Sequence, residues 1–138
     1  MNSTLQIVKK YPFSCLCILT IWIICLIPVP ETRLKHVAFI DKWTHMVMYA
    51  GTCAVIWMEY HKNHRKAKHR SRLEISIKSL LWWGWLAPVL MSGVVELAQE
   101  YCTGGNRNGD WIDFAANATG ATLTLCAGML WVWFRARE

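Results

Sequence analysis

The fold of this chain is decided by residues 79–99, which read SLLWWGWLAPVLMSGVVELAQ. This stretch carries a single ionisable residue, Glu96, and it matches the roughly 20 apolar residues with which an α-helix crosses a bilayer. Three further runs have the same character and lie at Phe13–Val29, Trp43–Tyr60 and Trp111–Phe134. The sequence therefore predicts an all-α integral membrane protein, a four-helix bundle in which residues 1–138 form one domain.

The composition argues against an ordinary soluble domain. Of the 138 residues, 54% are hydrophobic and 17% are charged, and the charges fall in blocks between the apolar runs. The four runs leave little chain for a separate soluble domain, so function is expected on the helices and their short connections. The first run follows Lys9 and Lys10 but precedes no small-x-small cleavage motif, which favours a retained signal anchor over a cleaved signal peptide.

The basic residues are unevenly distributed, and this predicts the orientation of the chain. Eleven of the 15 lie at the two ends or in the second connection, and four lie in the first and third connections. Cytoplasmic segments of membrane proteins carry an excess of Lys and Arg, so both termini are expected in the cytoplasm. The net charge of +6 then reflects orientation and does not call for a nucleic-acid partner. The eleven are Lys9, Lys10, Lys62, Arg65, Lys66, Lys68, Arg70, Arg72, Lys78, Arg135 and Arg137.

Polar and ionisable side chains gather at the outer ends of three of the four runs. Such groups are costly at the edge of hydrocarbon and rarely persist there without a function. Within each run they are spaced three or four residues apart, which places them on one helix face. At about 1.5 Å per residue the deepest lie on the order of 5–10 Å inside the helix ends, so an outward-open polar pocket is expected. The set is Asp41, Lys42, His45, Tyr49, Glu96, Gln99, Arg107, Asp110, Asp113 and Asn117.

Each of these residues also has a purely structural interpretation. A lone His45 or Asn117 in a membrane helix is often an interhelical hydrogen-bond partner. Lys42 and Arg107 can be snorkelling anchors, and Asp41 can pair with Lys42 or cap the second helix. Packing does not require three carboxylates and a histidine at one depth, so the sequence favours a functional site.

The order and spacing of these residues resemble the VanZ-like family of small bacterial membrane proteins. The matching pattern is Asp41-Lys42-x-x-His45-x-x-x-Tyr49, then Glu96-x-x-Gln99, then Arg107-x-x-Asp110-x-x-Asp113-x-x-x-Asn117-x-x-Gly120. The connection from Gln99 to Arg107 is longer than the compact, Pro-containing form typical of the family. The resemblance implies a multi-pass protein of the bacterial cytoplasmic membrane.

The resemblance also implies two functions. The name-giving family member is associated with resistance to teicoplanin, a glycopeptide that acts on cell-wall precursors at the outer membrane face. The family is similar to a wider set of helical membrane proteins proposed to act on the phosphate linkages of lipids. The implied partner is thus a membrane lipid or a lipid-linked cell-wall precursor.

The first hypothesis is an enzyme that hydrolyses or exchanges the phosphate head group of a lipid. Lys42 and Arg107 are suited to bind the phosphate, and His45 is suited to act as nucleophile or general acid/base. Asp41 or Asp113 is expected to orient His45. The remaining residues expected on the substrate side are Tyr49, Gln99, Asp110 and Asn117.

Glu96 leaves two versions of this hypothesis open. In one, partial burial makes Glu96 a general base. In the other, Glu96, Asp110 and Asp113 hold a divalent cation against the phosphate, and His45 is the base.

Two other classes of function remain. One is a non-catalytic protein that binds a lipid-linked precursor or a glycopeptide antibiotic. The other is a small transporter whose carboxylates relay protons, although the inner halves of the runs contain almost no polar residues for a path across the membrane.

Overall fold

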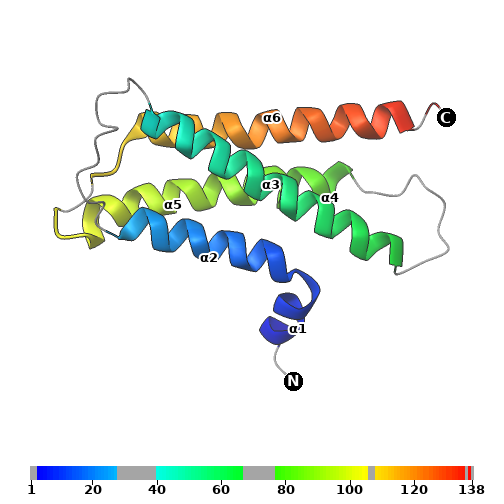
Figure 1. Cartoon of the computed structure of the whole chain (residues 1–138), viewed down its shortest axis with the longest axis horizontal. Coiled ribbons are helices and arrows are strands. Elements are labelled where there is room, and N and C mark those ends of the chain that lie inside the picture. Colours follow the sequence, from blue (N-terminus) through cyan, green and yellow to red (C-terminus); the bar gives the residue numbers. More distant parts are fainter. Residues whose placement is uncertain (1–2, 28–39, 67–76, 106–107, 136, 138) are drawn as a thin grey trace.

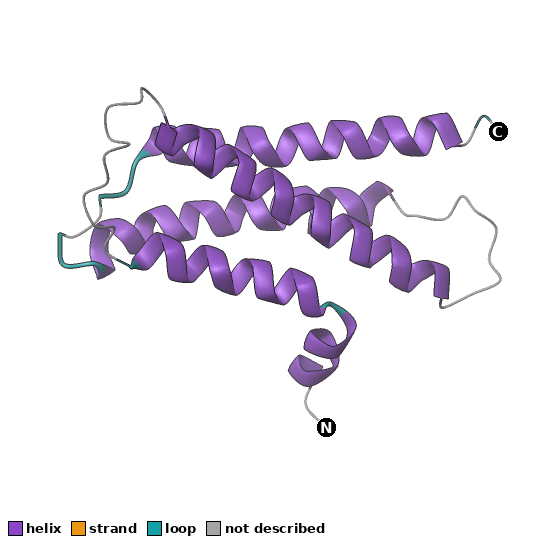
Figure 2. Ribbon diagram, viewed as in Figure 1, coloured by secondary structure: helices purple, strands orange, loops and turns teal. Residues whose placement is uncertain are grey.

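The computed structural model describes residues 3–27, 40–66, 77–105, 108–135 and 137, and all the regular structure in these ranges is helical. Figure 1 shows α2, α3, α5 and α6 extending side by side, and Figure 2 shows that the described residues are mostly helical. The all-α prediction is confirmed. The elements are α1 (Ser3–Lys10), α2 (Pro12–Leu26), α3 (Ile40–Lys66), α4 (Ile77–Leu81), the π-helical turn η2 (Trp82–Leu86), α5 (Ala87–Cys102) and α6 (Trp111–Arg135).

Two of the described helices are long and apolar enough to cross a membrane. They are Lys78–Cys102, which runs through α4, η2 and α5, and Trp111–Phe134. A third crossing is added if α1 and α2, which meet at a bend of 99°, form one broken span. Helix α3 is longer than either but is not among them. The structure therefore supports a membrane protein, with two of the four predicted spans meeting this criterion outright.

The wide turn η2 explains how the third run accommodates a proline. A proline inside a helix lacks the N–H for the i→i−4 bond, and its ring clashes with the carbonyl four residues before it. Gly84 is the middle residue of η2, and Pro88 follows it by four residues, in the first turn of α5. In η2 the Ala87 N–H bonds to the Trp82 carbonyl, five residues back, so the helix widens just before the proline. The run continues through Pro88 as α5.

Helices α3 and α6 approach each other most closely at Gly120. A Cβ atom added there would overlap the carbonyl oxygen of Met46 and would lie 3.1 Å from the nitrogen of Ala50. Close by, the Thr124 hydroxyl donates to the Ala50 carbonyl at 2.9 Å. Small residues in membrane helices allow such an approach, and Gly120 is the position at which the two backbones require it.

The buried core lies where α2, α3 and α5 meet. Ile21, Cys25, Tyr49 and Val95 pack together as an apolar core, and each is at most 2% exposed. These four residues occupy the inward faces of three helices, while many other apolar side chains remain on the outside. An apolar exterior is the arrangement that a lipid solvent permits.

The first turn of α2 is held by the carboxylate of Glu59, a residue of α3. Glu59 accepts hydrogen bonds from the backbone N–H of Phe13 at 3.1 Å, and from the N–H and hydroxyl of Ser14 at 2.8 and 2.6 Å. The first N–H groups of a helix have no partner within the helix. Glu59 supplies that partner and fixes α2 against α3.

Candidate functional site

Four of the predicted site residues meet in the interior, at the end of the molecule where α3 and α6 begin and α5 ends. His45 comes from α3, Glu96 from α5, and Asp113 and Asn117 from α6. His45 is 5% exposed, Glu96 and Asp113 are each 6% exposed, and Asn117 is fully buried. We call these four residues the buried cluster. They were expected to line an open pocket, and the structure instead packs them in the interior, where three of them are joined by hydrogen bonds.

The hydrogen bonds within the cluster determine how the His45 ring is protonated. Glu96 accepts the N–H of Asp110 at 3.1 Å and the side-chain amide N–H of Asn117 at 3.4 Å. Because an ionised carboxylate only accepts, the NH2 group of Asn117 faces Glu96 and its Oδ1 atom faces His45. That oxygen lies 3.2 Å from Nδ1 of His45. With Glu96 ionised, Nδ1 must therefore carry a proton, and the lone pair of the neutral ring is on Nε2.

Nε2 of His45 is directed between two carboxylates. It lies 3.9 Å from Oδ1 of Asp41 and 3.9 Å from Oδ2 of Asp113. A nitrogen lone pair and two carboxylates around one point form a site that a cation between the three side chains can occupy.

The same three side chains are the group in the described ranges whose geometry fits a metal ion. One ligand atom from each of Asp41, His45 and Asp113 lies within 4.8 Å of the other two. The mixture of imidazole and carboxylate ligands is suited to first-row divalent ions. This set shares only Asp113 with the set proposed from the sequence, in which Glu96 and Asp110 were the other ligands.

Lys42 connects the cluster to its more exposed rim. Its ammonium donates to Asp110 at 2.6 Å and to Asp113, and lies 3.8 Å from Asp41. The side chain of Asp41 is 56% exposed and that of Asp110 is 39% exposed, whereas that of Asp113 is 9% exposed. We call Asp41, Lys42 and Asp110 the rim. Lys42 thus bridges exposed and buried carboxylates.

Asp110 also begins helix α6. Its Oδ1 atom accepts the N–H of Ile112 at 2.8 Å, and its carbonyl accepts the N–H of Phe114 at 3.1 Å. This is the N-cap arrangement for a helix whose first residue is Trp111. The hydrogen bond from Lys42 and the one from Ile112 both lower the pKa of Asp110, because they stabilise its charged form.

The loop before α6 folds back on α5, which places Asp110 over the cluster. The N–H of Gly109 donates to Glu100 at 3.0 Å. A Cβ atom at Gly109 would lie 2.5 Å from the carbonyl oxygen of Glu96, so a glycine is needed for this approach. Glu100 was not identified from the sequence. Its position one turn after Glu96, on the same face of the helix, is the signal that could have found it.

Two further predicted residues are buried but take no part in the hydrogen bonds of the cluster. Gln99 donates to the carbonyl of Cys25 at 2.9 Å, and so connects α5 to the end of α2. Tyr49 is fully buried in the apolar core. The Tyr49 hydroxyl and the Gln99 carbonyl oxygen have no hydrogen-bond partner among the described residues. Arg107, predicted to bind phosphate, lies outside the described residues.

A small groove runs along the outside of the cluster, between α3 and α6. Its volume is about 130 Å³, and its lining combines the stem of Lys42 with apolar side chains. The lining residues are Lys42, Trp43, Met46, Ala116 and Thr119. The rim therefore borders an apolar surface on the flank of the two helices.

The chain matches no protein-family model, no curated protein and no solved structure.

Proposed function

We propose that this chain crosses the bacterial cytoplasmic membrane four times, with both termini in the cytoplasm, and acts on the phosphate head group of a lipid at the outer face. The observation that carries the proposal is the orientation of His45. Asn117 holds Nδ1, and Nε2 is directed toward the rim carboxylate Asp41 and toward Asp113. An imidazole held in one tautomer, with its free nitrogen toward charged groups, is the arrangement used for proton transfer and nucleophilic attack.

Besides a histidine for proton transfer, the reaction needs a positive charge to bind the phosphate, and Lys42 of the rim supplies it. Lys42 already contacts two carboxylates, Asp110 and Asp113. An entering phosphate replaces one of these anions at the ammonium, and a carboxylate displaced from it is then free to accept a proton. The apolar groove beside Lys42 offers a surface for the acyl part of the substrate.

In the hydrolytic version, His45 acts as the general base. Nε2 takes a proton from water, the water oxygen forms a bond to phosphorus, and the bond from phosphorus to the leaving alkoxide breaks. The imidazolium then returns its proton to the leaving oxygen. Head-group exchange follows the same steps, with an alcohol in place of water. Asp113 stabilises the imidazolium while it exists.

A divalent cation is compatible with the same residues. Asp41, His45 and Asp113 would hold it, and it would act as a Lewis acid on the phosphate. Glu96 then remains in its hydrogen bonds to Asn117 and Asp110, where it orients Asn117 and the loop.

The alternative function is a non-catalytic binder of a lipid-linked precursor or of a glycopeptide antibiotic. The burial of the cluster favours it, because His45, Glu96 and Asn117 are each no more than 6% exposed and already contact one another. The resemblance of the motif to the VanZ-like family supports both functions, and we propose membership of that family on residues 41–120.

Purified protein in lipid nanodiscs tests the catalytic proposal. It is incubated with undecaprenyl-linked and glycerophospholipid substrates, with and without divalent metal, and products are measured by mass spectrometry. We expect turnover by the wild type and by Thr44→Ala, whose hydroxyl is exposed and bonds only within its own helix. We expect none by His45→Ala. Substrate binding without product in every case would favour the binder, and no binding at all would overturn both.

A further inference from the structure

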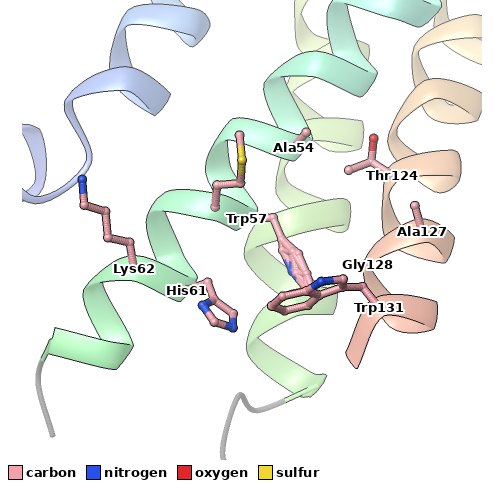
Figure 3. Close-up of a pocket in the computed structure, with 9 residues that line it drawn as sticks. Ala54, Trp57, His61, Lys62, Thr124, Ala127, Gly128 and Trp131 are labelled. Carbon is pink, nitrogen blue, oxygen red and sulfur yellow. The ribbon is translucent and has the colours of Figure 1, made fainter. Parts of the chain in front are cut away.

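A second cavity lies away from the buried cluster, between the second halves of α3 and α6. Its volume is about 740 Å³, within the range of about 300–1,000 Å³ of sites that bind small molecules. Figure 3 shows its side chains, which come from α3 and from α6 on the facing side. We call it the inner groove. Its lining includes Trp57, Met58, His61, Lys62, Gly128 and Trp131.

One end of the inner groove is built from aromatic rings. Trp57 and Trp131 meet edge to face, with ring centroids 5.9 Å apart and an interplanar angle of 87°. His61 contacts both rings, at centroid distances of 6.3 Å to Trp57 and 5.0 Å to Trp131. Indole and imidazole rings suit the zone where hydrocarbon meets head groups, because each combines an apolar body with a polar edge.

Gly128 allows this wall to form. A Cβ atom at that position would lie 2.8 Å from the Trp57 ring, closer than real Cβ contacts come. The indole therefore lies directly on the backbone of α6. The remaining lining residues, which include Ala54 and Ala127, are small or apolar and leave the volume open.

The groove lies at the basic end of the molecule. Lys62 lines it and is exposed. Figure 3 shows its ammonium directed away from His61, on a flexible four-carbon stem that allows it to turn toward the groove. Lys9 and Lys10 end α1, and Lys78 lies in α4. Figure 1 shows α1, the end of α3, the start of α4 and the C-terminus at the same end. An occupant of the groove thus meets apolar walls and positive charge together.

We propose that the inner groove binds an anionic phospholipid of the leaflet at this end. One acyl chain packs against Trp57, Met58 and Ala127, and the phosphate of the head group lies between Lys62 and the imidazole of His61. Basic pockets between membrane helices on the cytoplasmic side bind such head groups. The inference rests on α3 and α6 crossing a membrane and is independent of the chemistry of the buried cluster.

Phospholipid is favoured over a second copy of the chain because of charge. The exposed charged residue among those that line the groove is basic. A second copy would bring its own inner-groove face, with a second Lys62, against the first in a symmetric dimer. An anionic head group neutralises this charge, and the bilayer presents it at high local concentration.

Native mass spectrometry tests the proposal. Protein is extracted from nanodiscs that contain equal amounts of phosphatidylglycerol and phosphatidylcholine with identical acyl chains, and the lipids retained per protein are counted. We expect wild type to retain phosphatidylglycerol preferentially. Lys62→Gln should reduce that preference about fivefold, the effect of one basic residue near a membrane surface. Ala127→Phe should reduce retention of both lipids by filling the groove.

Two matched variants control for general effects. Lys78→Gln removes an exposed positive charge at the same end, but Lys78 does not line the groove. Ala115→Phe adds the same ring to an exposed position of α6 near the buried cluster. Both should behave as wild type. Equal retention of the two lipids by wild type would overturn the proposal, as would an equal effect of Lys62→Gln and Lys78→Gln. A lipid-free dimer would also overturn it, because the groove would then belong to a second copy.

Discussion

Asn117 accepts a hydrogen bond from His45: its Oδ1 atom lies 3.2 Å from Nδ1 of the imidazole, between residues 72 positions apart in sequence. Asn117 in turn donates to Glu96. With Glu96 ionised, the tautomer of a buried histidine in α3 is therefore set by a carboxylate in α5, through an amide in α6. This connection between three helices underlies the first prediction.

Asn117→Leu should abolish the orientation of His45 while nearly conserving side-chain volume. With no acceptor at Nδ1 the two tautomers become closer in energy, and we expect turnover to fall about 10–100-fold, as when a residue that orients a catalytic histidine is lost. The 15N chemical shifts of the His45 ring report the tautomer directly. A ring that stays protonated on Nδ1 in Asn117→Leu would contradict the role given to Asn117. Thr44→Ala is the control.

Gly120→Ala should destabilise the protein, because a Cβ atom there overlaps the Met46 carbonyl and forces α6 away from α3. We expect a loss of about 1–3 kcal/mol, the usual range for an overpacked contact. Gly51→Ala is the matched control, since nothing lies within 4 Å of a Cβ atom at that position. Thermal unfolding of the detergent-solubilised protein compares the two. Equal melting temperatures would mean that the helices do not meet at Gly120.

Glu59→Ala should loosen α2. It leaves the N–H groups of Phe13 and Ser14 without the acceptor that the structure provides. Phe13 is exposed to its surroundings, but Ser14 is buried, and an unpaired buried donor costs about 1–3 kcal/mol. Ser14→Ala removes one of the three hydrogen bonds and should have a smaller effect. Cysteine-accessibility labelling of Cys15 and Cys17, compared with Cys126, measures the loosening. An unchanged labelling rate at Cys15 in Glu59→Ala would exclude this role.

The Lys42–Asp110 pair should make the stability of the folded protein depend on pH in the acid range. The pKa of Asp110 lies below its ordinary value of 3.8 in the folded protein. A depressed carboxyl pKa gives stability that is present above 3.8 and is lost as the pH falls through the lower, folded value. Melting temperature should therefore fall in that acid range, and less so in Asp110→Asn, which has no proton to gain. If the melting temperatures of wild type and Asp110→Asn fell equally with pH, the Lys42–Asp110 pair would not stabilise the fold.

The proposed topology predicts where reporter domains appear. Alkaline phosphatase and green fluorescent protein fused after Lys68, or after Glu138, should both report a cytoplasmic position, because the basic residues gather at these segments. Fusion within the connection that follows Cys102 should report the opposite side. Phosphatase activity from the Lys68 fusion would reverse the side assigned to the buried cluster.

The helices could be predicted closely because a chain in lipid must satisfy its backbone groups internally. The run at Trp111–Phe134 corresponds to α6, Trp111–Arg135, and residues 79–99 fall within α4, η2 and α5. Helix α3 extends from Ile40 to Lys66, beyond the predicted Trp43–Tyr60. Hydropathy marks only the apolar part of a helix, whereas the charged residues that follow have high helix propensity and continue the helix.

The site could be predicted in part. Spacing placed His45, Glu96, Asp113 and Asn117 on faces at similar depth, and the structure brings these four together. The same reasoning placed Gln99 with them, but its amide bonds to Cys25 of α2. Nothing in the spacing of one helix indicates that a carbonyl at the end of another helix is available.

By itself the sequence determined that the chain is helical, that it suits a membrane, and which face of each helix is polar. These properties depend on neighbours three or four residues away, so local composition is sufficient. Only the tertiary structure decided that Lys42 contacts Asp110 and Asp113, and that Asn117 sets the His45 tautomer. A hydrogen bond forms only within about 3.5 Å, and turning a helix by one residue, about 100°, removes it. The rotation of each helix is set by its contacts with the others, as where Gly120 admits the backbone of α3.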